Sequence, residues 1–382
     1  MTHDIIKNNH RYQIRVLDID GNIEAVYDDV VSIFYRKQVN NVGICIIAVP
    51  EGHDLLNYAM KDQLIQVMIS YTRLPVLAEH FGQIWSADYY GLFRDRQIAT
   101  DANGNVYHIL YFPSLLEVLA RYVSAIPAAT GGKSQWTGAR LSVICNDVVR
   151  WNCTAEATVA NDRLRDATVI RDLHDNGAIP GTPEVNYSVA PGRNILEFLQ
   201  ELAPICGFDI DVIYSHPTVP GGISVQQFLG QLGTDRSTSV MFDLALDNTA
   251  QSSLSFDGLR ERTVAIVGGQ GEESARTFSI RTGANYAADN DYEVYVDARS
   301  NPDDELDDIG DARLAELTAR IQMLNAVTSS DGWVYRRDFS HGDLVTVRFA
   351  GFSQVKKIGT TEVQFDQDQT FHIRMEMIEP HA

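Results

Sequence analysis

Apolar and polar residues alternate along the first hundred positions, in short runs that are typical of β-strands with one buried face. The clearest run is 12–19, and Asp20-Gly21 behind it supplies a hairpin turn, because both residue types tolerate positive φ. Asp101 and the residues after it repeat this turn chemistry. Further strands are expected at 31–36, 43–49, 64–71, 82–90 and 106–111. Short strands at this spacing predict a small barrel or sandwich.

The middle of the chain changes to helical spacing. Ser114 and Glu117 stand three positions apart, as in a capping box, where the two side chains bond free backbone N–H groups at the start of a helix. Apolar residues follow at helical spacing until Pro127 stops the run. The next stretch is less regular, and its short apolar runs at 141–144 and 148–157 are interpreted as strands.

A second helix, followed by a strand, is expected near residue 200. Asn194 stands where it can cap this helix, and the apolar face runs over 195–202. Gly207 ends the helix, since glycine adopts the left-handed conformation that closes many helices. From Phe208 onward apolar and polar residues alternate, which predicts a strand.

The last third of the chain contains one more helix among strands. Strands are expected at 241–246, 343–349, 355–365 and 371–377, the last of which alternates strictly. The acidic block 303–308 is interpreted as a solvated loop, with calcium binding as the alternative. Behind it, one apolar stripe predicts a helix; its members are Ile309, Leu314, Leu317, Ile321 and Leu324. The chain is therefore expected to end, as it begins, in a small β-domain.

The most conspicuous motif is an apolar strand, 264–267, that runs into Gly268-Gly269-Gln270-Gly271-Glu272. A dinucleotide-binding loop needs a third glycine and a following helix, whereas here Glu272 and Glu273 stand where a pyrophosphate would lie. The residues after them alternate like a strand, with Phe278 and Ile280 on one face. The glycines are therefore interpreted as a place where the chain reverses or runs close to another backbone.

Composition restricts the class of protein further. A chain of 382 residues with 45% hydrophobic residues has material for two to four domains. The net charge of −20 opposes tight binding to nucleic acid. Neither a signal peptide nor a membrane span is expected, so synthesis in a cytoplasm is predicted. Buried free thiols are expected at Cys45, Cys145, Cys153 and Cys206, because their spacing does not fit a metal site.

No catalytic motif stands out in the sequence. It contains no H-E-x-x-H, no G-x-S-x-G and no Cys/His cluster, and its ten histidines are scattered. A carboxylate pair among the 51 acidic residues stays open, although nothing selects one. The expectation is a protein without enzymatic activity, cofactor or metal.

The order of these parts resembles the tail-associated baseplate hub proteins of long-tailed bacteriophages, a siphophage tail-component family. Four segments carry the resemblance: 194–212, 241–248 followed by 252–256, 264–276 and 338–347. In the last of them, an acidic residue, an aromatic residue and Gly342-Asp343 precede a Val-Thr-Val strand. Each segment alone is common in β-proteins, and the ordered set makes the identification.

The resemblance implies an α+β, β-dominated multidomain fold with two small β-barrel domains and α/β insertions. It divides the chain into a first hub domain at 1–112, an α/β decorating region at 113–245, a second hub domain at 246–282 with 331–382, and an inserted acidic loop and helix at 283–330. Landmark or ring-core positions are expected in the strands around the two motifs: Val264, Ile266, Gly268, Gly269, Gly271, Leu344, Val345 and Val347.

The resemblance also implies a function. Such hubs form a homotrimeric ring at the tail tip of the virion, where two barrel-like domains per subunit give a pseudo-sixfold surface. They bind the distal tail protein or last tube ring, a fibre or spike, and the tape-measure protein, and they let DNA pass on ejection. Two alternatives from other classes stay open: a tail-tip enzyme that degrades host cell wall or surface polysaccharide, and a carbohydrate-binding adhesin.

Overall fold

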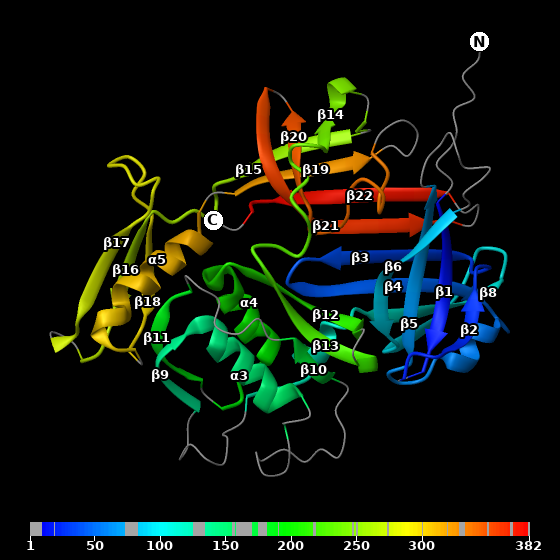
Figure 1. Cartoon of the computed structure of the whole chain (residues 1–382). Helices are drawn as coiled ribbons and strands as arrows, with labels where there is room; N and C mark the ends of the chain where they lie inside the picture. Colours follow the sequence, from blue (N-terminus) through cyan, green and yellow to red (C-terminus); the bar gives the residue numbers. More distant parts are fainter. Residues whose placement is uncertain are drawn as a thin grey trace. The chain divides into compact units, whose positions relative to one another are not determined.

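The computed structural model divides the chain into two compact units. Unit 1 comprises Met1–Ser252 and Leu324–Ala382, and unit 2 comprises Ser253–Met323. The structure describes residues 10–18, 20–72, 83–124, 134–154, 157, 170–174, 182–189, 191–216, 219–246, 248–249, 251–272, 275–299, 301–318, 320–327, 333–349, 351–366 and 370–380. Strands predominate in both units (Figure 1), so the predicted β-dominated class is confirmed.

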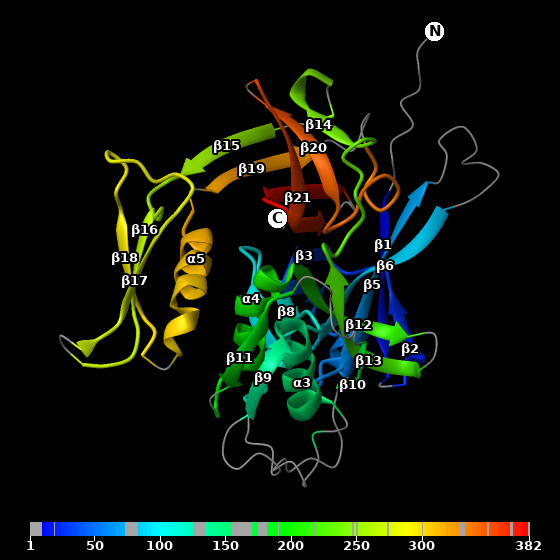
Figure 2. The ribbon, with the colours of Figure 1, turned by 60° about the vertical axis from the view of Figure 1, so that its left-hand side comes forward.

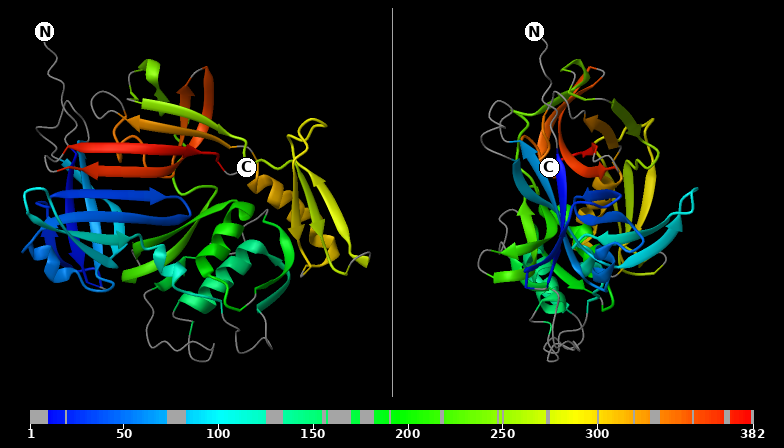
Figure 3. Two further views of the ribbon diagram at one scale, coloured as in Figure 1. Left: turned by 180° about the vertical axis from the view of Figure 1, so that it is seen from behind. Right: turned by 90° about the vertical axis from the view of Figure 1, so that its right-hand side faces the viewer.

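The largest sheet has ten strands and joins the two ends of the chain. In spatial order they are β15 (Gln251–Asp257), β19 (Arg320–Val327), β22 (Phe371–Ile378), β21 (Phe352–Phe365), β3 (Ser32–Gln38), β4 (Asn41–Pro50), β8 (Val106–Pro113) and β7 (Asp95–Thr100), with β20 (Leu344–Phe349) paired to β21 and β14 (Met241–Asp243) paired to β20. β21 and β3 are antiparallel neighbours, from Ile33 opposite Phe365 to Gln38 opposite Thr360. The red and blue strands therefore lie side by side in Figure 1 and, from behind, in Figure 3.

The alternation seen in the sequence decides which faces of these strands are buried. In β22 the side chains of Phe371, Ile373, Met375 and Met377 are buried, whereas His372 and Arg374 are exposed. Apolar side chains at every second position reach the same face of a strand, and burying that face holds the strand in register. The strand predicted at 371–377 is thus confirmed.

A four-stranded sheet, β2 (Ile23–Tyr27), β1 (Arg11–Leu17), β5 (Leu64–Thr72) and β6 (Gln83–Leu92), completes the N-terminal region. Gly21 has φ of 90° in the β1–β2 turn, and Asp18 accepts hydrogen bonds from the backbone N–H of Asp20 and Asn22. Asp101 performs the same role between β7 and β8. Both predicted turns are confirmed, whereas β2 and β7 were not expected. A short 3-10 helix, η1 (Asp54–Tyr58), lies between β4 and β5.

The α/β part of unit 1 corrects one prediction and confirms another. The strands expected at 141–144 and 148–157 are wrong: the main helix there is α3 (Leu141–Cys153). Its buried residues recur at helical spacing, at Leu141, Ile144, Cys145, Val148, Val149 and Asn152. Adjacent apolar residues made the helical spacing hard to recognise in the sequence. Packing against a second helix favours the helix over a strand.

That second helix is α4 (Ile195–Cys206), which the sequence predicted. Asn194 caps it through Oδ1, which accepts hydrogen bonds from the N–H groups of Leu196 and Glu197, and Gly207 follows with φ of 68°. The strands of this region form two further sheets: β12 (Phe208–His216), β13 (Val219–Leu229) and β10 (Ile170–His174) in one, β9 (Ser134–Arg140) and β11 (Glu184–Val189) in the other.

The predicted capping box at Ser114 is wrong. The helix there, α2 (Glu117–Ala120), is four residues long and its N-cap side chain makes no capping hydrogen bond. Ser114 instead accepts a hydrogen bond from the N–H of Gly43, and Glu117 forms an ion pair with Arg121. The Ser114 hydroxyl therefore finds its hydrogen-bond partner in the neighbouring sheet and not at the start of a helix.

Unit 2 contains a three-stranded sheet with one helix on one face (Figure 2). The sheet order is β17 (Phe278–Thr282), β16 (Val264–Gly268) and β18 (Glu293–Asp297), and the helix is α5 (Leu306–Glu316), preceded by η6 (Asp303–Glu305). The helix predicted to continue to Leu324 ends at Glu316, because residues 320–327 form β19. A further 3-10 helix, η4 (Leu244–Leu246), follows β14, where a longer strand was expected.

The predicted small β-barrels are not found among the described strands, whose pairings form open sheets. β3 and β4, from the first predicted hub domain, share a sheet with β21 and β22 from the second, and β16 and β17 belong to unit 2. Long-range pairing decides which strands become neighbours, and local sequence patterns do not encode it. The predicted domain boundaries stay a prediction.

Candidate functional site

The glycine-rich motif forms the turn between β16 and β17, which pair as antiparallel neighbours. Gly269 donates a hydrogen bond to the carbonyl of Thr277 (2.8 Å), and Thr277 donates one to the carbonyl of Gln270 (3.0 Å). Gly271 has φ of 98°, a conformation that side chains strongly disfavour. The predicted chain reversal is therefore confirmed, and the N–H of Gly269 already has a backbone partner.

The other two glycines of the motif allow close packing. A Cβ atom at Gly269 would lie 2.6 Å from Cδ1 of Leu306, and one at Gly268 would lie 2.9 Å from the guanidinium of Arg276. Helix α5 and the Arg276 side chain therefore approach this backbone only because it carries no side chains. The motif is a packing device of unit 2.

The face of the unit 2 sheet away from α5 is apolar and open to solvent. Adjacent strands place two rows of side chains across it: Phe278, Gly268 and Asp297 in one row, and Ile280, Ile266 and Tyr295 in the next. The exposed fractions are 54% for Phe278, 67% for Ile280 and 52% for Tyr295, whereas Ile266 is half-buried. We call Ile266, Phe278, Ile280 and Tyr295 the open face.

Arg276 holds this face in one geometry. Its guanidinium carbon lies 6.0 Å from the ring centroid of Phe278 and 5.6 Å from that of Tyr295. The same group donates hydrogen bonds to the carbonyls of Gly268 and Gly269 and to Asp297. Hydrogen bonds from Arg299 and Arg276 lower the pKa of Asp297 to about 2. The arginine therefore joins two aromatic rings and the glycine turn into one platform.

The opposite face of this sheet is covered. Ala265 and Val267 pack there with Leu306 and Leu314 of the α5 segment. The acidic block is exposed to solvent, as expected, but it is not a loop: it forms η6 and the start of α5. Arg281 forms an ion pair with Asp307 of the block (3.3 Å) and another with Asp311, further along the helix (2.7 Å). Within the described residues, no three His, Cys, Asp or Glu side chains are placed to hold a metal ion, so the calcium alternative gains no support.

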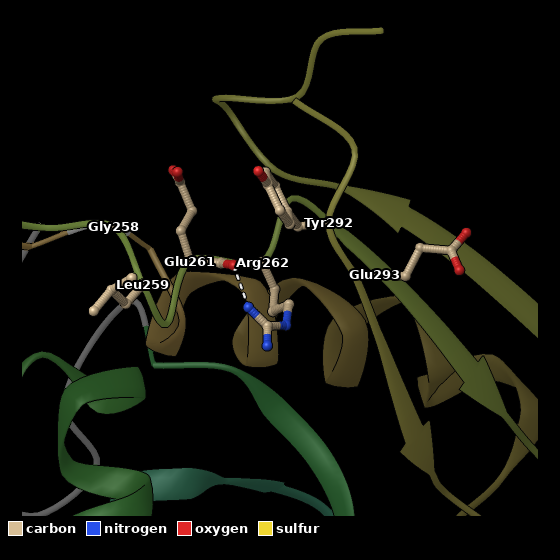
Figure 4. Close-up of a pocket in the computed structure, with 6 residues that line it drawn as sticks. All are labelled: Gly258, Leu259, Glu261, Arg262, Tyr292 and Glu293. Carbon is tan, nitrogen blue, oxygen red and sulfur yellow. Dashed lines mark hydrogen bonds between the residues drawn. The ribbon is translucent and has the colours of Figure 1, made fainter. Parts of the chain in front are cut away.

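A surface hollow of about 410 Å³ lies where the chain enters β16 and β18 (Figure 4). Gly258, Leu259, Glu261, Arg262, Tyr292 and Glu293 line it. Glu261 and Tyr292 point to the same side, whereas Arg262 turns away from them and donates a hydrogen bond to the Glu261 carbonyl (2.7 Å). The hollow thus presents carboxylates beside a tyrosine, without a nucleophile or an acid–base pair in contact.

Unit 1 contains its own cluster of ionised groups, buried around Asp88. The fully buried Asp88 side chain accepts hydrogen bonds from Tyr35 (2.6 Å), Lys37 (3.0 Å) and Tyr335 (3.0 Å), and Arg336 lies 3.5 Å away. Burial by itself raises the pKa of Asp88, but the cations of Lys37 and Arg336 outweigh it and lower that pKa to about 2. The carboxylate therefore joins β3, β6 and the 333–340 segment.

A second buried ion pair connects the long sheet to the α/β part. Lys357 of β21 donates to both carboxylate oxygens of Asp209 on β12, at 2.9 and 3.0 Å, and both side chains are 1% exposed or less. Asp209 also accepts hydrogen bonds from Asn40 Nδ2 and from the Leu232 N–H. Every oxygen thus has a partner, which a buried charge requires.

The Gly342-Asp343 motif forms a third buried connection. Asp343 is 2% exposed and accepts hydrogen bonds from the N–H groups of Thr234 (2.7 Å) and Ser340 (2.8 Å) and from Arg236 (3.0 Å). Gly342 has φ of 87°. The motif therefore fixes the entry into β20 and attaches the 232–236 loop to it.

The predicted landmark residues do not gather in one place. Val264, Ile266, Gly268, Gly269 and Gly271 belong to unit 2 or its turn, whereas Leu344, Val345 and Val347 lie on β20 in the ten-stranded sheet. Val345 and Val347 are buried in the core of unit 1 (0% and 1% exposed). Their predicted role in a ring stays a prediction.

None of these clusters has the arrangement of a catalytic centre. Burial and the nearby Asp88 raise the pKa values of Tyr35 and Tyr335 well above the usual range, so both stay protonated donors. Burial and the Lys37 charge lower the pKa of His341, which therefore stays neutral. Perturbed pKa values often mark active sites, but here the groups are buried and occupied by one another.

The sequence had not indicated Asp88, Asp209 or Lys357. Each is a charged residue within a strand: Asp88 in β6, Asp209 in β12 and Lys357 in β21. A charge inside a strand is the one signal that could have revealed them, because such groups become buried only with partners. The cysteines follow their prediction: all four are buried and none of them forms a disulfide. In the described part of the chain, no helix has the length and apolar character to span a membrane.

Comparison with known proteins agrees with this architecture. Residues 13–377 match the family model of the Siphovirus ReqiPepy6 Gp37-like protein. No curated protein sequence matches the chain.

Solved structures of phage tail proteins share the fold. The 43 kDa tail protein of prophage MuSo2 from Shewanella oneidensis aligns with a TM-score of 0.61 and 11% identity over 97% of this chain and 98% of that one. The tail protein of Neisseria meningitidis MC58 aligns with a TM-score of 0.57 and 10% identity, over 97% of each chain. Prophage tail protein gp18 of Listeria monocytogenes EGD-e aligns with a TM-score of 0.53 and 12% identity, over 97% of this chain and 95% of that one.

Proposed function

Because the chain belongs to the Siphovirus ReqiPepy6 Gp37-like protein family, we propose that it is a structural hub protein of a phage tail. The observation that carries the proposal is the fold, which three phage tail proteins share over at least 97% of this chain. In the proposed role, three copies form a ring at the tail tip that binds the tail tube on one side and a fibre or spike on the other. DNA passes through the ring on ejection.

The arrangement of the strands supports a ring-forming role. Two regions of the chain are expected to form the ring, and their strands are neighbours in a single sheet: β3 and β4 from the first region, β21 and β22 from the second. A long continuous sheet is a stiff element, and its edges can pair with other chains. The net charge of −20 also suits a conduit that must release DNA rather than adsorb it.

We place one contact between subunits at the free edge of β7. This strand is the last in the sheet order and pairs there with β8 alone among the described strands. Nearly all of its side chains are exposed, including Ile98 at 60%. An edge with unpaired backbone groups and an exposed apolar side chain is a template for another chain.

The first test is the mass of the purified chain and its location in the particle. We expect light scattering to give three times the subunit mass of 42.6 kDa, and antibody-labelled electron micrographs to show the label only at the tail tip. Label along the tube or on the head would overturn the hub proposal. Clearing of a peptidoglycan gel, abolished by one carboxylate-to-amide change, would favour the enzyme alternative.

Ile98→Asp tests the β7 contact. A charge on the edge strand should convert the trimer to a monomer without unfolding it, because Ile98 is exposed in the subunit. Met60→Asp is the matched control, since Met60 is 58% exposed and lies outside the sheets. Trimers that persist in Ile98→Asp, or dissociate equally in Met60→Asp, would place the contact elsewhere.

A further inference from the structure

The open face of unit 2 is an apolar surface on a sheet whose other face is already covered. Phe278, Ile280 and Tyr295 lie adjacent across three strands, each more than half exposed. The core of unit 2 lies against α5, on the other side. Contiguous exposed apolar side chains are rare on soluble proteins without an interaction role. The face therefore has the character of a docking surface.

The border of this face is acidic. Residues 283–297, which lead into and form β18, contain Asp289, Asp291, Glu293 and Asp297 and no Lys, Arg or His. Arg276 and Arg299 already pair with Asp297, so the border charge that a partner would meet comes from Asp289, Asp291 and Glu293. Glu293 shares the exposed side of β18 with Tyr295 and also lines the hollow of Figure 4. Unit 2 as a whole has 15 acidic and 7 basic residues, a formal net charge of −8. An occupant must therefore bring positive charge around an apolar centre.

The face is also held in place before anything binds. Arg276 is fixed by the carbonyls of Gly268 and Gly269 and by Asp297, and it lies against both aromatic rings. The register of β16 with β17 and β18 sets the spacing of the rows. Pre-organised aromatic surfaces lose little conformational entropy on binding, so a small contact area can give useful affinity.

We propose that the open face is a docking surface for a basic segment of another protein, one that presents apolar side chains flanked by Lys or Arg. Charge decides this occupant. A second copy of the chain would bring the same acidic border and be repelled, and nucleic acid or another polyanion would be repelled likewise. The inference does not depend on the trimer, because none of its residues belongs to the ten-stranded sheet.

The experiment uses the full chain and two labelled synthetic peptides, one of alternating leucine and lysine and one of alternating leucine and glutamate. Fluorescence polarisation should show binding of the lysine peptide only. Ile280→Ser should weaken that binding about tenfold, the loss expected for a central apolar contact. Glu293→Lys should weaken it about three- to tenfold, and this loss should shrink at high salt.

Two matched controls separate docking from general attraction. Met60→Ser removes a comparably exposed apolar side chain from unit 1, and Asp304→Lys reverses an exposed charge on η6, away from the face. Each should change the affinity less than about twofold, since neither touches the surface.

Three results would overturn the proposal. If Asp304→Lys weakens peptide binding as much as Glu293→Lys, the attraction is not specific to this face. If a neutral chitin oligosaccharide binds and Ile280→Ser abolishes that binding, the occupant is a glycan. If the chain self-associates through a contact that Ile280→Ser removes, the occupant is a second copy.

Discussion

Units 1 and 2 place their charged and apolar side chains in opposite ways. Unit 1 buries the carboxylates of Asp88, Asp209 and Asp343, each surrounded by donors from distant segments. Unit 2 keeps its ion pairs near solvent and leaves Phe278 and Ile280 exposed. Buried pairs are costly unless their geometry is satisfied, so they favour one arrangement of the strands. Exposed apolar groups instead leave part of the surface available to a partner.

The size of each unit explains the difference. Unit 1 brings together several sheets and helices, so a strand can be covered on both faces and a charge within it becomes enclosed. Unit 2 has one sheet and one long helix, which covers a single face. The comparison predicts that the same kind of substitution has different effects in the two units.

Val347→Asp against Ile280→Asp should show the largest contrast. Val347 is 1% exposed in β20, so a carboxylate there has no partner and should cost more than about 4 kcal/mol, enough to prevent soluble folding. Ile280 is 67% exposed, and its substitution should change the free energy of unfolding by less than about 0.5 kcal/mol. Urea unfolding followed by circular dichroism measures both, and equal losses would contradict the proposed difference between the units.

Lys357→Met tests the buried pair. It leaves Asp209 charged and buried, which should lower the free energy of unfolding by about 3–5 kcal/mol. Adding Asp209→Asn should restore part of that loss, because the amide oxygen still accepts from Leu232. Arg299→Met is the control in unit 2, where the partner Asp297 is exposed and no measurable loss is expected. If Lys357→Met leaves the free energy of unfolding unchanged, the buried pair does not stabilise unit 1.

Acid should destabilise unit 1 through Asp88. Its folded pKa is about 2, below the usual 3.8, so the unfolded chain takes up the proton first as pH falls. The stabilisation is present above about pH 4 and is lost as pH falls toward about 2, which amounts to about 2 kcal/mol. In Asp88→Asn the corresponding part of the pH dependence should disappear. An unchanged pH profile in that variant would contradict the assignment.

Gly271→Ala should have a modest effect that is confined to unit 2. Besides the positive φ, the new Cβ would meet the Ala275 carbonyl at 2.4 Å, so a loss of about 1–3 kcal/mol is expected. Gly104→Ala is the matched control: its φ is 85°, but nothing lies within 4 Å of a Cβ there, so it isolates the conformational term. Hydrogen exchange should accelerate in β16 and β17 and stay unchanged in unit 1. Acceleration in both units would indicate that they unfold together.

Local patterns in the sequence predicted several elements correctly. The hairpin turns at Asp20-Gly21 and Asp101 and the helix cap at Asn194 form as expected, because their hydrogen bonds join residues a few positions apart. The alternation in β22 predicted its buried face for the same reason. Local patterns failed where a residue far away in the sequence supplied the hydrogen-bond partner. Ser114, for example, accepts a hydrogen bond from the N–H of Gly43 instead of capping a helix.

The sequence by itself therefore determined the β-dominated class, the strand and turn chemistry of the ends, and the resemblance to phage tail proteins. Only the tertiary structure decided that the two predicted hub regions share one sheet, that Asp88 and Asp209 are buried, and that Phe278 and Ile280 face solvent. The physical reason is the same in each case. The sequence of a strand determines which side chains share a face. Whether that face contacts water, a helix or another strand depends on segments far away in the chain.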